Sequence, residues 1–420
     1  NINSVFMHAA QNRDTTILKS LFSIFKDVID IDNVCLPSKM NLSFNITKFL
    51  YTTFKDEITI NKINKNGYTA LMFAAKYTNV EIVSFLYNMF KDTIDINKQN
   101  NNNETAFMLA ALNTDVGVIQ YLYDICKDAI DINAKTKNGD TAFMLAAQNT
   151  NVEVINFLYD TFGNNKLDIN TENNNGDTAF MIAAQNTNLE VIQFVHRKYK
   201  YNGYTIDINK QNNDGNTAYM LAAKNTNNQV LAYLWEMYST NVDINKQDKN
   251  GNTAFMLAAN NTNAIVIELL HKRFKDDIGS INNQNIDGDT AFMLAAQNTE
   301  VEVSQFLYDQ FSDEIDIGRQ NKNGNTALML AVQHSNIAVL KLIVKNCKDA
   351  MYINEQNFDC DTAFMLAVKN KNIEIIQYLY DTFKDIIDIN QQNNDGNTTF
   401  MLAAWENNNI KVLQYLYNTF

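Results

Sequence analysis

The chain has 420 residues, a formal net charge of −13 and an apolar fraction of 46%. Its 13 glycines and single proline, Pro37, are too few for a loop-rich or all-β fold. The acidic charge argues against sequence-independent binding to nucleic acid or to anionic membranes, because both depend on clustered lysine and arginine. The composition therefore favours a helical protein whose partner, if it has one, is a protein of basic character.

Membrane and secretion signals are missing from the sequence. No window approaches the roughly 18 uninterrupted apolar residues of a membrane span. The first four residues resemble neither a signal peptide nor a natural start, so we expect the natural N-terminus to be missing. Four cysteines stand far apart without CxxC spacing, which predicts neither a disulfide framework nor a zinc site: Cys35, Cys126, Cys347 and Cys360. These features predict an intracellular, cytoplasmic protein.

A segment similar to TAFMLAA recurs through the chain at intervals of 36 to 39 residues. Such a period is typical of a solenoid built from repeated units. Ten units begin near a threonine, at Thr69, Thr105, Thr141, Thr178, Thr217, Thr253, Thr290, Thr326, Thr362 and Thr398. An earlier unit covers residues 4–32, and a degenerate one covers residues 33–68. We therefore predict one continuous array of about 12 repeats over residues 1–420.

The degenerate unit carries Pro37 where its first helix should run. Proline inside a helix costs about 3 kcal/mol, because it removes a hydrogen bond and clashes with the preceding turn. We expect a local irregularity at residues 32–45.

Each unit shows two helical stripes of apolar residues. In the unit that starts at Thr141, the threonine is a suitable N-cap for a short first helix. A polar linker, residues 148–151, separates it from a bulkier second helix that ends near Phe162. The following polar stretch, rich in asparagine and ending in a lone glycine, predicts a projecting turn, which we call the finger.

The unit resembles the ankyrin repeat. Residues 173–184, NNNGDTAFMIAA, correspond to the family pattern D-x-x-G-x-T-P-L-H-x-A-A, and residues 189–192 correspond to x-E-V-V. The resemblance implies an all-α, ankyrin-type solenoid of stacked antiparallel helix pairs with projecting β-turn or hairpin fingers, curved into a superhelix. Here alanine replaces the family's proline and methionine replaces its histidine. The histidine's hydrogen bond to the threonine is then lost, so we expect cohesion between repeats to depend more on Met, Phe and Leu packing.

Residues with catalytic potential do not depart from the repeat pattern together, which predicts that the protein is not an enzyme. His196 and His271 stand where other repeats have tyrosine, which indicates packing positions. Cys126 and Cys347 replace a repeated phenylalanine, and Cys360 replaces the finger glycine, where a side chain is mildly strained. We predict no catalytic, cofactor or metal site.

The recurring Asp-Ile-Asn, as in residues 131–133, has two interpretations. Stacked copies could supply calcium ligands, but no calcium-loop spacing is present. Adjacent polar residues of this kind more often cap turns, and this is the interpretation that we favour.

Ankyrin-like proteins usually bind other proteins in the groove between the fingers and the first helices. Most groove positions here are nearly identical polar residues, such as Gln148, Asn149, Gln185 and Asn186. Larger side chains interrupt this pattern near the two ends, and they are the candidate protein-binding residues: Tyr68, Tyr77, Leu112, Ile286, His334, Phe358 and Trp405. The alternative is that they are ordinary exposed residues on a solvated surface.

Two functions remain open. The first is a non-enzymatic scaffold or adaptor that binds a protein partner in the groove. The second is a structural protein that self-assembles by end-to-end stacking, because the last unit stops at Phe420 without a polar cap and could associate through an uncapped terminal repeat. The uniform polar groove makes the second function a serious rival.

Overall fold

The computed structural model describes residues 48, 51–52, 58–163, 166–298, 300–346, 350–405 and 410–419. The unit predicted at residues 4–32, the irregularity predicted at residues 32–45 around Pro37, and the cysteines at 35 and 347 lie outside these residues. The chain divides into two compact units, Asn1–Ile206 and Asp207–Phe420, and each is described here by itself. A single continuous array over the whole chain remains a prediction.

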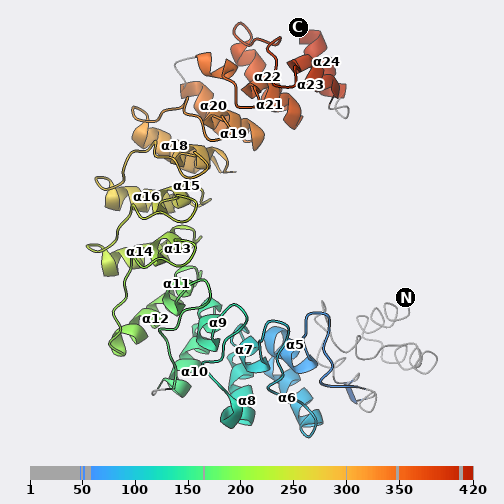
Figure 1. Ribbon diagram of the computed structural model, residues 1–420, viewed down its shortest axis with the longest axis vertical. Coiled ribbons are helices and arrows are strands. Elements are labelled where there is room, and N and C mark those ends of the chain that lie inside the picture. The colour runs from blue at the N-terminus through green and yellow to red at the C-terminus, as the bar shows by residue number, and fades with distance from the viewer. Residues whose placement is uncertain are drawn as a thin grey trace, which may run out of the picture. The chain divides into compact units, whose positions relative to one another are not determined.

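Unit 1 consists of helix pairs in which a short first helix packs against a longer second helix. Figure 1 shows the first helices of this unit in one row and the second helices in another. Each first helix packs on the first helix of the next pair, and each second helix on the next second helix. The described helices are α5 (Ala70–Tyr77), α6 (Val80–Phe90), α7 (Ala106–Ala110), α8 (Val116–Cys126), η2 (Lys127–Ala129), α9 (Ala142–Gln148), α10 (Val152–Phe162), α11 (Ala179–Ala184) and α12 (Leu189–Tyr201).

Unit 2 repeats the same arrangement. Its described helices are α13 (Ala218–Ala223), α14 (Asn228–Tyr238), α15 (Ala254–Ala259), α16 (Ala264–Phe274), α17 (Ala291–Ala296), α18 (Val301–Phe311), α19 (Ala327–Gln333), α20 (Ile337–Asn346), η3 (Ala350–Asn354), α21 (Ala363–Asn370), α22 (Ile373–Phe383), α23 (Thr399–Trp405) and α24 (Ile410–Thr419). Across the described ranges, β pairing is limited to isolated bridges, one at Glu172 and Thr178 and one at Gln356 and Thr362. The predicted all-α repeat fold is confirmed.

The repeated threonine starts each first helix, as predicted. In α9, Thr141 Oγ1 accepts a hydrogen bond from the backbone N–H of Met144 at 3.4 Å, which satisfies one of the donors that a helix leaves free at its first turn. The methionine also contributes to the cap in some repeats, since the Thr69 N–H donates to Met72 Sδ at 3.4 Å. The same Oγ1 contact recurs at Thr69, Thr105, Thr178, Thr217, Thr253, Thr290, Thr326, Thr362 and Thr398.

The apolar core lies between the two rows of helices. In the repeat that starts at Thr141, Phe143 is 1% exposed, and Ala146, Val154 and Leu158 are completely buried. Burying one such large side chain contributes about 1.5–3 kcal/mol, while the small alanine allows the neighbouring helix to approach closely. A buried methionine is present in every described first helix from α5 to α21, and buried phenylalanine or leucine accompanies it in most of them, as expected.

The fingers are tight turns closed by an asparagine or an equivalent residue. Asn173 Oδ1 accepts backbone N–H groups from Asn175 at 3.0 Å and Asp177 at 2.9 Å. Neighbouring fingers also contact each other, because the Asn174 N–H donates to the Asn138 carbonyl at 2.9 Å. Gly139 has φ +82°, and a Cβ there would lie 2.6 Å from Asn174 N, so both the turn and the contact require glycine.

A second asparagine joins most described repeats to the one before it. We call it the linker asparagine, since it lies at or just after the end of the first helix. Asn149 Nδ2 donates to the carbonyls of Ala111 at 3.0 Å and Asn113 at 2.7 Å, and its Oδ1 accepts the Asn151 N–H at 2.9 Å. Linker asparagines with bonds to the preceding repeat are Asn113, Asn149, Asn186, Asn261, Asn298, Asn336 and Asn370.

This contact corrects the assignment of Asn149 and Asn186 to the groove surface. They are only 4% and 5% exposed, and their amide groups are used within the fold. Cohesion between repeats thus has a polar component beside the apolar packing, and this component was not predicted from the sequence.

We expect Asn149→Ala to lower the free energy of unfolding by about 1–3 kcal/mol, because two buried carbonyls lose their donor. Asn138→Ala is the matched control, since its side chain is exposed on a finger, and a change within about 0.5 kcal/mol is expected. Urea unfolding followed by circular dichroism measures both. Equal stability of the two variants would contradict the structural role of the linker asparagine.

Candidate functional site

An aromatic patch lies in the groove at the first described repeat of unit 1. We define it as Tyr68, Phe73, Lys76 and Tyr77. The rings of Phe73 and Tyr77 are 4.7 Å apart, and Lys76 Nζ lies 5.8 Å from the centre of the Tyr68 ring and 5.3 Å from that of Tyr77. Lysine over a ring face is held by the ring quadrupole. The structure thus brings together two of the predicted binding residues, Tyr68 and Tyr77.

The patch is linked to an acid on the next repeat. Lys76 Nζ donates to Tyr68 Oη at 3.4 Å, and Tyr68 Oη donates to Glu104 Oε2 at 3.4 Å. Burial and the nearby Glu104 carboxylate raise the pKa of Tyr68, so its hydroxyl stays protonated and continues to donate. Asn100 Nδ2 donates to the same carboxylate oxygen at 2.6 Å.

The remaining predicted binding residues lie on other repeats. Leu112 is half-buried and takes, one repeat later, the position of Lys76. Ile286 and Phe358 share one finger position in unit 2 and are both exposed. His334 is the exposed C-cap of α19, and Trp405, at the end of α23, is 78% exposed.

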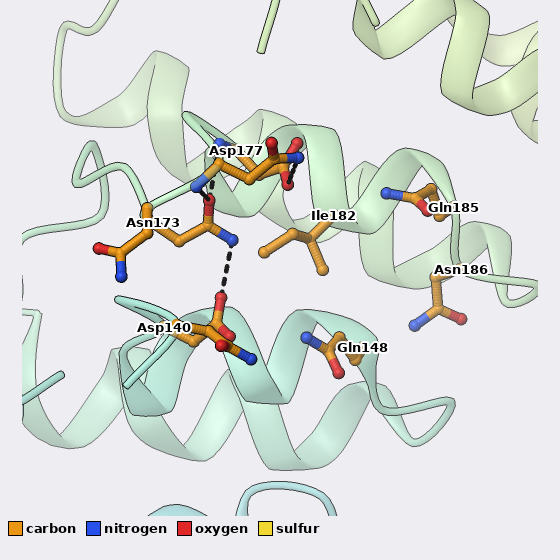
Figure 2. Close-up of a pocket in the computed structure, with 10 residues that line it drawn as sticks. Asp140, Gln148, Asn173, Asp177, Ile182, Gln185 and Asn186 are labelled. Carbon is orange, nitrogen blue, oxygen red and sulfur yellow. Dashed lines mark hydrogen bonds between the residues drawn. The ribbon is translucent and has the colours of Figure 1, made fainter. Parts of the chain in front are cut away.

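A polar hollow of about 670 Å³ lies between two successive fingers and first helices of unit 1. Figure 2 shows Asp140 and Gln148 on one side of it and their counterparts Asp177 and Gln185 on the other, with Asn173 between the two acids. Asn173 Nδ2 donates to Asp140 Oδ1 at 2.8 Å. The hollow is lined by Asn138, Asp140, Gln148, Asn173, Asn174, Asn175, Asp177, Ile182, Gln185 and Asn186.

Three carboxylates occupy one position in three successive repeats of unit 1. We call Glu104, Asp140 and Asp177 the carboxylate column, and all three are mostly buried. Burial raises the pKa of Asp140, the hydrogen bond from Asn173 opposes that rise, and the charges of Asp177 and Glu104 add to it. The negative charge of Asp140 is therefore costly within the column.

In unit 2, aspartate makes this contact in some repeats, at Asp289 and Asp361, and asparagine makes it in others. At the equivalent position Asn325 Oδ1 accepts from Asn357 Nδ2 at 3.0 Å, which reproduces the contact between Asp140 and Asn173. Asn252 does the same with Asn285 at 2.9 Å. The fold consequently requires an acceptor at this position, and it does not require a negative charge.

We expect Asp140→Asn to raise the melting temperature at pH 7 by about 1–3 °C. Because the pKa of Asp140 is raised on folding, the folded state holds its proton more tightly than the unfolded state. Ionisation near neutral pH therefore costs stability, and this cost disappears as the pH falls through the raised pKa. The advantage of the variant should vanish at acidic pH.

The reverse substitution is the matched control. Asn325→Asp places a third acid between Asp289 and Asp361, so it should lower the melting temperature at pH 7. At acidic pH the melting temperature of this variant should return to that of the original protein. Calorimetry from about pH 3 to pH 8 measures both variants. If the difference in melting temperature between Asp140→Asn and the original protein does not change with pH, the stability cost assigned to the Asp140 charge would be contradicted.

The residues with catalytic potential pack as predicted. The His196 ring contacts Phe180, with centroids 6.2 Å apart, and burial followed by the Lys200 charge lowers the pKa of this histidine. His271 contacts Phe306 and Phe311, and its pKa is lowered by burial and then by Lys275.

The cysteines that the structure describes also occupy the predicted positions. Burial raises the pKa of Cys126 to about 11, so its thiol is a poor nucleophile. Cys360 has φ +57°, the mildly strained conformation that we predicted for a side chain in place of the finger glycine.

Asp131 has the turn-capping role that was favoured over calcium binding, because its carboxylate accepts the backbone N–H of Asn133 at 3.1 Å. No three acidic, histidine or cysteine side chains of the described residues come close enough to hold a metal ion. The described helices are also too short or too polar for any of them to cross a bilayer.

Several residues of this groove were not predicted from the sequence. Phe73 replaces a leucine of most other repeats, and this departure could have been read from the aligned units. Lys76 is less distinctive, because lysine recurs at its position as Lys224 and Lys369. In the sequence, the residues of the carboxylate column were part of a series of nearly identical polar groove positions. Its significance depends on burial, which the sequence does not show.

Two comparisons with known proteins give matches. A family described as ankyrin repeats (3 copies) matches residues 6–136, 123–205, 199–280, 265–357 and 346–419. Among solved structures, the chain is similar to the ankyrin repeat domain of Bcl-3, a member of the IkappaB protein family, with 21% identity and a TM-score of 0.44. That match covers 58% of this chain and 99% of the Bcl-3 chain. No curated protein matches the sequence.

Proposed function

Because this chain belongs to the ankyrin repeat family, as its repeat motif predicted, and such repeats generally mediate contacts between proteins, we propose that its groove binds a protein partner. The groove of unit 1 is the proposed site. It combines the aromatic patch, the carboxylate column and the polar hollow along successive fingers and first helices. Ankyrin modules are typically non-enzymatic, and we propose the same of this chain.

The observation that supports this site is the carboxylate column. Glu104, Asp140 and Asp177 stand at the position that asparagine occupies in some other repeats, and burial and the charges of its two neighbours make the ionisation of Asp140 costly. A basic segment of a partner would offset this cost by supplying opposite charge. This favours groove binding over end-to-end self-assembly, since the acids line a groove and not a stacking face.

The aromatic patch supports the presence of an apolar or long side chain in the same partner. Tyr68 and Tyr77 offer large rings that are already held by Lys76 and Phe73, so little side-chain entropy is lost on binding. We propose that they contact an apolar or long side chain of the partner, while the column contacts its lysine or arginine residues.

Binding of a fluorescein-labelled, arginine- and lysine-rich peptide, followed by fluorescence anisotropy, tests the proposal. The variant Glu104→Gln/Asp140→Asn/Asp177→Asn should bind about tenfold more weakly, because three ion pairs of roughly 0.5 kcal/mol each are lost. The addition of Tyr68→Ala and Tyr77→Ala should weaken binding further.

The control removes the same charge elsewhere. Asp214→Asn/Asp287→Asn/Asp359→Asn neutralises three exposed finger acids of unit 2 and should change the affinity by less than about twofold. An equal loss in both triple variants would mean that the peptide senses only net charge, and the groove of unit 1 would then not be the site.

A further inference from the structure

The repeat that starts at Thr178 departs from its neighbours on the side away from the groove. Its second helix, α12, has 13 residues, whereas α10 has 11. The interval from Thr178 to Thr217 is 39 residues, the longest in the array. An insertion in one repeat enlarges a loop on one face, and such loops often belong to a binding surface.

The end of α12 is also the place where the charge changes sign. From Arg197 to Ile206 the chain has three cations and no carboxylate. Several second helices have tyrosine and then aspartate at this point, as at Tyr159 and Asp160. The protein has a net charge of −13, so the local charge of this segment is opposite in sign to that of the whole chain.

Two of these cations are available to a partner. Arg197 and Lys200 are exposed, and within the part of the chain that the structure describes neither forms an ion pair. Lys198 is different, because its Nζ lies 3.8 Å from Asp160 Oδ1 and 4.0 Å from the centre of the Tyr159 ring. Lys198 therefore holds α12 against α10.

Aromatic side chains accompany the cations. Tyr201 is 84% exposed, and Tyr204 is 40% exposed with its ring centre 5.9 Å from that of the buried Tyr199. Gly203, between them, has φ +75°, and a Cβ there would meet nothing within 4 Å. The insertion is thus a turn that holds Tyr204 against the helix and leaves Tyr201 in solvent.

A hollow of about 360 Å³ adjoins this turn. Asn202 and Tyr204 line it from the insertion, and Tyr159 and Lys166 line it from the preceding repeat. Asn202 Nδ2 donates to Tyr159 Oη at 2.8 Å and so fixes one wall. Asp168 contributes an acid to the lining beside the Lys166 cation, so the hollow carries one charge of each sign.

The second helices form a row opposite the first helices within unit 1 (Figure 1), so this surface is separate from the groove. We propose that Arg197, Lys200, Tyr201 and Tyr204, which we call the α12 patch, bind an acidic segment of another protein. The two cations contact its carboxylates, and the tyrosines and the hollow accept an apolar side chain. The groove and the α12 patch then select partners of opposite charge.

Charge complementarity favours an acidic polypeptide over nucleic acid or lipid. Two free cations on an acidic protein are too few to hold a long polyanion, whose binding depends on many phosphate contacts. A short acidic segment needs only local attraction. The rest of the protein surface is acidic and repels such a segment, so binding is confined to the α12 patch.

The chain contains a closely matched control for this patch. In α16, residues 271–275 read HKRFK, whereas residues 196–200 of α12 read HRKYK. Lys272 and Lys275 occupy the positions of Arg197 and Lys200 and are also exposed. In α16, however, Asp276 and Asp277 follow directly and neutralise most of the charge.

Fluorescence anisotropy with the full chain tests the proposal. The probe is a fluorescein-labelled glutamate-rich peptide with one central leucine, and its glutamine counterpart serves as the neutral probe. We expect Arg197→Glu/Lys200→Glu to weaken binding of the acidic peptide by about tenfold or more, Tyr201→Ala to weaken it by about threefold, and added salt to weaken it further.

The α16 variant Lys272→Glu/Lys275→Glu changes the charge equally and should alter binding by less than about twofold. Melting temperatures of both double variants, which should agree, show that folding is intact. Equal losses in the two double variants, or no binding of the acidic peptide to the original protein, would overturn the proposal. Tighter binding of oligo-dT, or of phosphatidylcholine vesicles containing phosphatidylserine, in the same assay would also overturn it.

Discussion

The contact on which the repeat stack depends is the hydrogen bond from a buried asparagine amide to the backbone of the preceding repeat. A short first helix such as α9 exposes carbonyls at its end that cannot be satisfied within the helix. Asn186 Nδ2 supplies donors to two of them, Ala147 O at 2.9 Å and Asn149 O at 2.8 Å. The position of each helix pair is therefore fixed by directional contacts as well as by apolar packing, which has no direction of its own.

This polar framework explains how the surface can vary without loss of the fold. The finger asparagines and linker asparagines satisfy the backbone, so the residue before the threonine needs only an acceptor. Asn325 meets that need without charge, and Asp140 meets it with charge. The end of the second helix can vary in the same way. Helix α12 is longer and is followed by a basic turn, while Val191 and Val195 on its inner face remain buried.

The fold was predictable from the sequence because its signals are local. Thr141 caps the helix that follows it, and Cys360 takes the positive φ of the glycine that it replaces. The function of Asn149 could not be read in this way, because its carbonyl partners lie 36 to 38 residues earlier and a polar linker does not show which amide points inward. The recurrence of asparagine at this position was interpreted as a uniform polar groove surface. Tyr68 and Tyr77 were predicted as candidates because they interrupt the pattern, whereas Asp140 conforms to it and was not predicted as one.

Hydrogen exchange of the side-chain amides, followed by NMR, tests the central claim most directly. If the linker asparagines hold the repeats together, the Nδ2 hydrogens of Asn149, Asn186 and Asn261 should exchange orders of magnitude more slowly than those of the exposed Asn138. Exchange of the linker asparagines as fast as that of Asn138 would show that their amides are open to water, and the account would be contradicted.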